Sequence, residues 1–159
     1  MYNKGSLVVY KRDVCKVVDI RVIHDESYYV LNSTIDSSLK IDVPVNKEKK
    51  LLRPLITKKE LDNLINEIKF LPVLDVEARM LEDEYKRLLK DGTMESLITI
   101  IKTAHLRNKI RQENKKKLAD NDQYYFNLAE RYLYNEISYV LNVSYDDAKN
   151  FVISSLNKR

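Results

Sequence analysis

The chain has 159 residues, which is long enough for one domain or two small ones with a buried core. Hydrophobic residues make up 44% and charged residues 33%, a balance typical of globular proteins, and the net charge is only +4. A single cysteine, Cys15, excludes an internal disulfide, and no apolar run approaches the length of a membrane span. The first residues also lack the apolar core of a secretion signal. We therefore expect a cytoplasmic protein with no membrane association.

The first third of the chain has the composition of β-strands. Short stretches rich in β-branched and aromatic residues are separated by polar turns, and the turn from His24 to Ser27 predicts a hairpin. The last stretch alternates apolar with polar residues and ends at Pro44, which indicates a half-buried strand at a sheet edge. Strands are expected at residues 7–10, 14–22, 28–31 and 39–43. Short strands joined by short turns predict a small bent sheet or barrel over residues 1–55.

From Thr57 onward the apolar residues follow the period of helices. Thr57 opens a capping box, and Pro72 ends the first helix. Gly92 is expected to close a second helix, Thr93 to cap the third and Ser144 to begin the last one. These signals predict a compact bundle of about five helices over residues 56–159.

The stretch from Thr93 to Lys117 changes character along its length. Its first half has apolar residues at helical spacing, which predicts a helix packed in a core. Between Lys102 and Lys117 it carries seven lysine or arginine residues and one acid, Glu113. Such a run is a candidate for phosphate contacts with a nucleic acid. A solvated helix end explains it about equally well.

No pattern of catalytic residues is visible in the sequence. Cys15 lies in an apolar strand, where a free cysteine usually packs as a small hydrophobic residue. The two histidines, His24 and His105, are far apart and lack the spacing of a helical metal pair. The sequence therefore predicts no enzyme, no catalytic residue, no metal site, no cofactor and no small-molecule substrate.

The eleven tyrosines include three that recur every seventh residue, Tyr125, Tyr132 and Tyr139, and the chain has no tryptophan. Tyrosines interleaved with basic residues can stack on nucleic-acid bases. A seven-residue spacing places them on one helix stripe, which favours a core or an interface over a base platform.

A set of short motifs resembles one family in order and spacing. The opening Gly5–Tyr10, GSLVVY, is similar to the G-D-x-V-V-Y that opens the CarD/CdnL group of bacterial transcription regulators. Further motifs are similar to the family's later strands and to the helical half of its Firmicute-like branch. They are YVL from Tyr29, LKIDVPV from Leu39, LR from Leu52, YK from Tyr85, DG from Asp91, IIKTAHLR from Ile100 and LAERYLYNEI from Leu128. The resemblance covers nearly the whole chain.

This resemblance implies an α+β fold with segregated domains. Residues 1–55 would form a Tudor-like β domain that binds the RNA polymerase β subunit, and residues 56–159 a helical domain. The helical domain would contact promoter DNA at the upstream edge of the bubble and stabilise the open complex. In the family, one strand of the β domain docks on the polymerase by adding to a strand edge. The matching residues here are Lys40, Ile41, Asp42, Val43 and Pro44. An alternating strand that ends in proline agrees with that role.

The chain departs from the family pattern at several positions. Lys11–Val14 replaces a motif that contains a turn glycine, and Asp42 stands where some branches have arginine. The family's minor-groove wedge tryptophan, expected near Val76–Arg79, is missing; the nearest bulky residues are Met80 and Leu81. An aliphatic wedge and the loss of the wedge both stay open.

The candidates for non-sequence-specific DNA contact are Arg79, Lys86, Arg107, Lys109, Arg111, Lys115, Lys116 and Lys117. The leading hypothesis is thus a non-enzymatic regulator that docks on RNA polymerase and holds promoter DNA through its phosphates. The alternative is a protein–protein module that kept the docking fold and lost the DNA role. A weak net charge and the missing tryptophan motivate that alternative.

Overall fold

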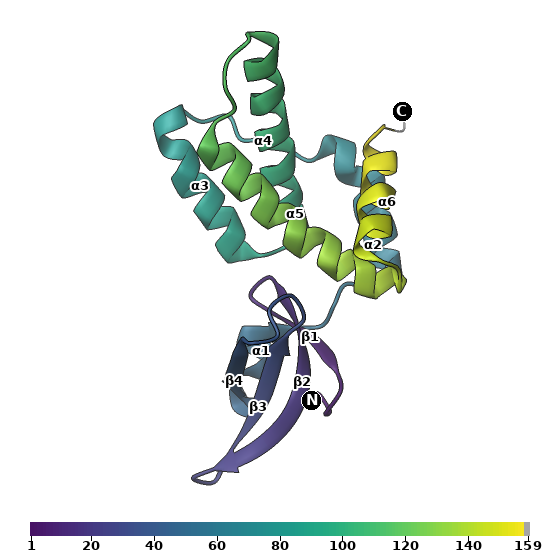
Figure 1. The fold of residues 1–159 in the computed structure, drawn as a ribbon. Helices are drawn as coiled ribbons and strands as arrows, with labels where there is room; N and C mark the ends of the chain where they lie inside the picture. The colour runs from purple at the N-terminus through teal and green to yellow at the C-terminus, as the bar shows by residue number, and fades with distance from the viewer. Residues whose placement is uncertain (158–159) are drawn as a thin grey trace. The chain divides into compact units, whose positions relative to one another are not determined.

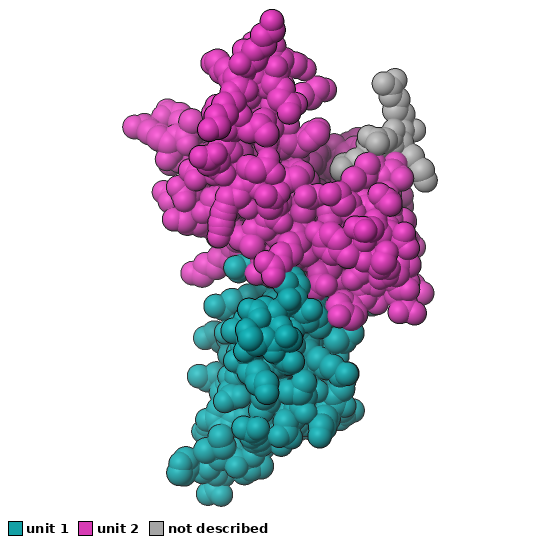
Figure 2. Space-filling model, in the orientation of Figure 1, with its two compact units in different colours: residues 1–57 teal, residues 58–159 magenta. Residues whose placement is uncertain are grey.

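The computed structural model describes residues 1–157, and the side chains of residues 1–155. The chain divides into two compact units, residues 1–57 and residues 58–159 (Figure 2). The first unit contains the strands and the second contains the long helices (Figure 1). The predicted α+β fold with segregated domains is therefore confirmed. The observed division at Thr57 lies close to the expected boundary.

Unit 1 is a five-stranded antiparallel sheet with the strand order β4-β3-β2-β1-β5. The strands are β1 (Leu7–Tyr10), β2 (Asp13–Ile23), β3 (Glu26–Ser33), β4 (Lys40–Pro44) and β5 (Leu52–Arg53). A 3-10 turn, η1 (Val45–Lys47), and the short helix α1 (Glu48–Leu51) connect β4 to β5. Among the described residues β4 and β5 each pair with one strand only, so the sheet is open rather than a closed barrel.

The hairpin of β2 and β3 has a shorter turn than the sequence predicts. Only His24 and Asp25 separate the strands, and their φ angles of 50° and 66° are those of a two-residue type I′ turn. This turn matches the right-handed twist of the strands, so the two residues after it join β3. Further along, the pairing shifts register between Val17 and Asp19, a bulge that bends the sheet.

Inward-facing side chains from all five strands form the core of unit 1. The buried set consists of Val8, Cys15, Val17, Tyr29, Leu31, Val43 and Leu52. Burial of each valine or leucine contributes about 1.5–3 kcal/mol relative to exposure. The alternation that predicted β4 follows from this core, because Val43 is buried in it while Lys40 and Asp42 face solvent.

Unit 2 is helical and contains the predicted number of long helices. They are α2 (Lys58–Glu67), α3 (Ala78–Asp91), α4 (Met94–Glu113), α5 (Asp120–Leu141) and α6 (Tyr145–Asn157), with a 3-10 turn, η2 (Ile68–Phe70), after α2. The helical path ends at Leu71, which is extended because proline at the next position disfavours the helical region. Helix α5 packs along α4 and also contacts α6, and α2 lies beside α6 (Figure 1).

Helix α4 is the centre of unit 2. From Met94 to Ala104 almost every residue is buried, including Ile100 and the polar Thr103, so this half has core on all sides. After Ala104 the helix emerges from the core, and Ile110 is 48% exposed. The sequence prediction of a core half followed by a solvated basic half is confirmed.

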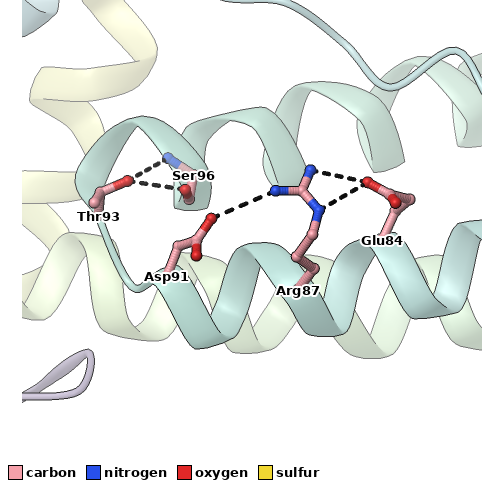
Figure 3. Close-up of polar contacts among 5 residues, drawn as sticks. All are labelled: Glu84, Arg87, Asp91, Thr93 and Ser96. Atoms are coloured by element: carbon pink, nitrogen blue, oxygen red, sulfur yellow. Dashed lines mark hydrogen bonds and ion pairs between the residues drawn. The ribbon is translucent and has the colours of Figure 1, made fainter.

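The corner between α3 and α4 forms as its sequence predicts (Figure 3). Gly92 adopts a left-handed conformation with φ 63° and closes α3. The Thr93 hydroxyl then accepts a hydrogen bond from the backbone N–H of Ser96 at 3.1 Å and caps α4. Figure 3 also shows Arg87 held between two carboxylates of its own helix.

Candidate functional site

Strand β4 presents an unpaired backbone edge. Its residues pair with β3 from Tyr28↔Pro44 to Asn32↔Lys40, and no other described strand pairs with β4. Pro44 has no N–H to donate, which is tolerated at a sheet edge. The remaining outward N–H and C=O groups of β4 are therefore open to an added strand.

The neighbouring strand β3 is anchored through the side chain of Tyr29. The Tyr29 hydroxyl donates to Glu48 Oε2 at 2.5 Å and accepts from the backbone N–H of Tyr2 at 3.0 Å. The Tyr2 ring packs edge-on against Tyr29 with centroids 5.9 Å apart. Burial, followed by the Glu48 contact, raises the pKa of the Tyr29 phenol, so the hydroxyl stays a donor at neutral pH. The edge strand β4 thus pairs with a strand that Tyr29 ties to Glu48 and Tyr2.

The basic end of α4 is closed by a Schellman motif. The N–H of Lys116 donates to the C=O of Arg111 at 2.7 Å, and the N–H of Lys115 donates to Gln112 at 3.0 Å. Lys115 takes the left-handed position with φ 57°, which glycine usually occupies. The lysines of residues 115–117 are exposed. They lie beside the negative end of the helix dipole, which favours cations even without a ligand.

The basic residues of α4 do not form one surface. Arg107, Arg111 and Lys116 line one hollow of about 240 Å³ together with Ile110. Lys109 lines another hollow with His105. Side chains two positions apart on a helix point about 200° apart around its axis. This explains why positions 109 and 111 point to different sides of α4.

Arg107 lines the same hollow as Arg111 and Lys116, but its guanidinium is engaged in a hydrogen-bonded network inside unit 2. Its Nε donates to Asp122 at 3.0 and 3.2 Å, and the Tyr85 hydroxyl donates to the same carboxylate at 2.8 Å. The Asp122 side chain is 2% exposed and the Arg107 side chain 28%. Burial, and then the bond to Asp122, raises the pKa of Tyr85. We therefore exclude Arg107 from the phosphate proposal, because its charge is offset within the fold.

The candidates on α3 also have acidic partners. Arg79 Nε lies 2.7 Å from a Glu77 carboxylate oxygen, and Lys86 Nζ lies 3.8 Å from Glu82. All four side chains are largely exposed, so the pairs add little stability. They nevertheless reduce the positive charge that α3 offers to a polyanion.

The wedge region contains two bulky residues with opposite environments. Leu81 is buried in unit 2 at 5% exposure, whereas Met80 is 51% exposed in the first turn of α3. Phe70, which the sequence analysis did not single out, is 83% exposed at the end of η2. Phe70 lies two residues before Pro72, and the local sequence gives no sign that its side chain is exposed.

The tyrosine stripe of α5 runs from the core to the surface. Tyr125 is buried, stacks on Tyr124 with centroids 5.0 Å apart and contacts Tyr85 at 5.1 Å. Tyr139 is 42% exposed. Tyr132 between them is partly buried, so of the predicted core or interface stripe only Tyr125 lies fully in the core.

Reactive groups are few and separated in the described residues. Cys15 is buried in β2, and burial, with a smaller effect of Asp13, raises the pKa of its thiol to about 12. Among the described residues no group of three or more His, Cys, Asp or Glu side chains could hold a metal ion. Within the same residues, no helix has the length and apolarity needed to cross a membrane. The thiol is thus protonated and inaccessible, unlike a catalytic nucleophile.

The sequence matches no protein-family model, and the search of curated proteins finds no significant match. The geometry of the two units is therefore the basis for a functional proposal.

Proposed function

We propose that the chain is a non-enzymatic transcription regulator of CarD type. Its unit 1 docks on the β subunit of RNA polymerase through the edge of β4, and its unit 2 contacts promoter DNA through the basic end of α4. The observation that carries the proposal is the unpaired edge of Lys40–Pro44 in a small antiparallel sheet. That edge coincides with the docking strand of the family that the chain resembles.

The chemistry of β4 supports docking by strand addition. Main-chain hydrogen bonds would provide affinity along the open edge, and the flanking side chains would select the partner. Lys40 and Asp42 are both exposed, whereas Val43 anchors the strand in the core. A partner strand would therefore encounter one cation and one anion beside the backbone.

The DNA role rests on Lys109, Arg111 and Lys115–Lys117. These residues are exposed or partly exposed at the end of α4, and no acidic side chain forms an ion pair with them among the described residues. Their contacts would reach phosphates and not base edges, since the wedge tryptophan is missing. Tethering to polymerase raises the local DNA concentration, so a weak affinity is sufficient.

A second candidate function is docking without DNA binding. It is favoured by the ion pairs that occupy Arg79, Lys86 and Arg107, which leave fewer cations than the sequence suggests. The two functions share β4 and differ in the role of α4.

The docking step is tested by exchanging the two exposed charges of β4. The variant Lys40→Asp/Asp42→Lys keeps the net charge and leaves Val43 in place. We expect its retention by RNA polymerase to fall about tenfold or more, because both side chains would face the wrong charges. The matched control Asp19→Arg/Arg21→Asp exchanges an exposed pair on β2 and should bind like wild type.

Strand addition has its own signature in amide hydrogen exchange. Exchange at residues 40–43 should slow in the polymerase complex, since the outward N–H groups acquire acceptors. The proposal is wrong if wild type is not retained under conditions in which a CarD protein binds. Equal retention of the β4 variant and wild type would also contradict it.

The two candidate functions are separated by the salt dependence of binding to forked promoter DNA. Each phosphate contact contributes about 0.7–0.9 to the slope of log K against log salt. The variant Lys115→Gly/Lys116→Ala/Lys117→Ala should therefore reduce the slope by about 2–3. The control Lys47→Ala/Lys49→Ala/Lys50→Ala removes equal charge from unit 1 and should leave the slope unchanged. A wild-type slope near zero would favour docking without DNA binding.

A further inference from the structure

Unit 2 contains a cavity that neither proposed contact uses. It has a volume of about 630 Å³, within the range of roughly 300–1,000 Å³ common for ligand pockets. Side chains from α4, α5 and α6 line the cavity. A fourth wall comes from Val73, in the segment between η2 and α3.

The walls of this cavity are mainly apolar. They include Ile101, Leu106, Phe126 and Ile153 in addition to Val73. Leu106, Ile153 and Val73 are 43%, 39% and 39% exposed, so apolar surface continues to the solvent. An apolar body that entered the cavity would remove this surface from water, which contributes about 25 cal/mol per Å².

The wall that contains Val73 is fixed by hydrogen bonds. Lys102 Nζ donates to the carbonyls of Ile68, Lys69 and Leu71 at 3.0, 3.2 and 2.6 Å. The N–H of Leu74 donates to Thr103 Oγ1 at 2.9 Å. Since both anchors lie on α4, the segment cannot collapse into the cavity without losing them. The cavity is therefore pre-formed, which lowers the ordering cost of binding.

The charged groups of the lining favour an anion. Lys102, Lys149 and one carboxylate, Glu130, line the cavity, which leaves one positive charge in excess. The Lys102 ammonium is held by backbone carbonyls, so Lys149 is the lysine that can reach a ligand. Lys149 Nζ lies 3.7 Å from Glu130, longer than a hydrogen bond, so its donors are available to a ligand. His105 on α4 is exposed and offers a ring N–H as a second donor.

We propose that this cavity binds a small amphipathic carboxylate, with its apolar chain or ring between α4 and α6 and its carboxylate on Lys149 and His105. The inference is independent of polymerase docking and DNA contact, because it uses none of their residues. The ligand is bound and not converted, which is consistent with the sequence prediction of no small-molecule substrate.

Octanoate and its neutral analogue octanol test the proposal by isothermal titration calorimetry on the full chain. Wild type should bind one octanoate with a Kd below about 1 mM, and octanol more weakly. Lys149→Met should weaken octanoate about tenfold through loss of a charge-assisted bond and leave octanol unchanged. The matched control Lys90→Met, an exposed lysine of α3, should bind both like wild type.

Two further variants keep the test decisive if Lys149→Met perturbs the fold. Glu130→Gln/Lys149→Met removes both partners of the ion pair and should show the same selective loss of octanoate. Leu106→Trp fills the cavity from its exposed rim and should abolish binding of both ligands, with circular dichroism confirming the fold. The proposal is overturned if wild type shows no saturable binding of octanoate, or if Leu106→Trp and Lys149→Met both bind it like wild type.

Discussion

The buried carboxylate of Asp122 connects three elements of unit 2, and its partners allow a graded prediction. Asp122 lies at the start of α5, Tyr85 on α3 and Arg107 on α4. Removing Arg107 as Arg107→Met would leave a carboxylate that is 2% exposed with one neutral donor. Breaking a buried pair in this way costs about 3–5 kcal/mol of unfolding free energy.

The other two substitutions should cost less, for reasons visible in their exposure. Asp122→Ala leaves the guanidinium of Arg107 behind, but that side chain is 28% exposed and water can solvate it, so we expect about 3 kcal/mol. Tyr85→Phe removes one hydrogen bond of 2.8 Å to a charged acceptor and should cost about 1.5–3 kcal/mol. The partly exposed neighbour Arg111 forms no ion pair in the described residues, and Arg111→Met should change stability by less than about 0.5 kcal/mol.

Amide hydrogen exchange resolved to peptides of residues 58–157 measures these differences for unit 2 alone, which avoids assuming that the two units unfold together. The double variant Tyr85→Phe/Arg107→Met should be less destabilised than the sum of its parts, since both act on Asp122. If Arg107→Met is no more destabilising than Arg111→Met, Arg107 is not a structural residue and returns to the phosphate candidates.

Two further predictions concern the end of α4 and the core of unit 1. Lys115→Gly should raise the unfolding free energy of unit 2 by about 0.5–1 kcal/mol in the same exchange measurement, because a φ angle of 57° strains a residue with a Cβ atom. A decrease in the unfolding free energy would contradict the Schellman assignment. Burial raises the pKa of Cys15 from an ordinary value of 9.0 to about 12, so its thiol is protonated in the folded state where the unfolded chain has lost the proton. The stability contribution of this thiol is complete below pH 9 and is lost as pH rises from 9 toward 12. Serine does not titrate in this range, so Cys15→Ser should lose less unfolding free energy at alkaline pH than wild type, measured by hydrogen exchange of unit 1 peptides. An equal loss in both proteins would refute the burial argument.

Much of the fold was predictable from local signals in the sequence. Gly92, Thr93 and Pro72 determine helix ends through contacts within a few residues, so no knowledge of the tertiary structure is needed. The edge position of β4 was also predictable, because alternation and Pro44 both restrict where a strand can lie in a sheet. The length of the β2–β3 turn was missed, since a type I′ turn at His24 is uncommon without glycine.

The candidate sites depended on the sequence to different degrees. The basic run of α4 was visible as composition, but composition could not separate charges that are free from charges that are neutralised. Arg107 is paired with a residue fifteen positions later on another helix, and Lys102 is bound to carbonyls more than thirty positions earlier. Such partners are decided by which helices pack together.

The cavity shows the same division between sequence and structure. Its lining comes from α4, α5, α6 and the segment around Val73, and each residue alone has the pattern of an ordinary helix face. Local sequence therefore determined the strands, the helices and the caps of this protein, because those depend on backbone contacts between near neighbours. Only the tertiary structure decided which cations are free and where a cavity opens, because both depend on how side chains distant in sequence meet.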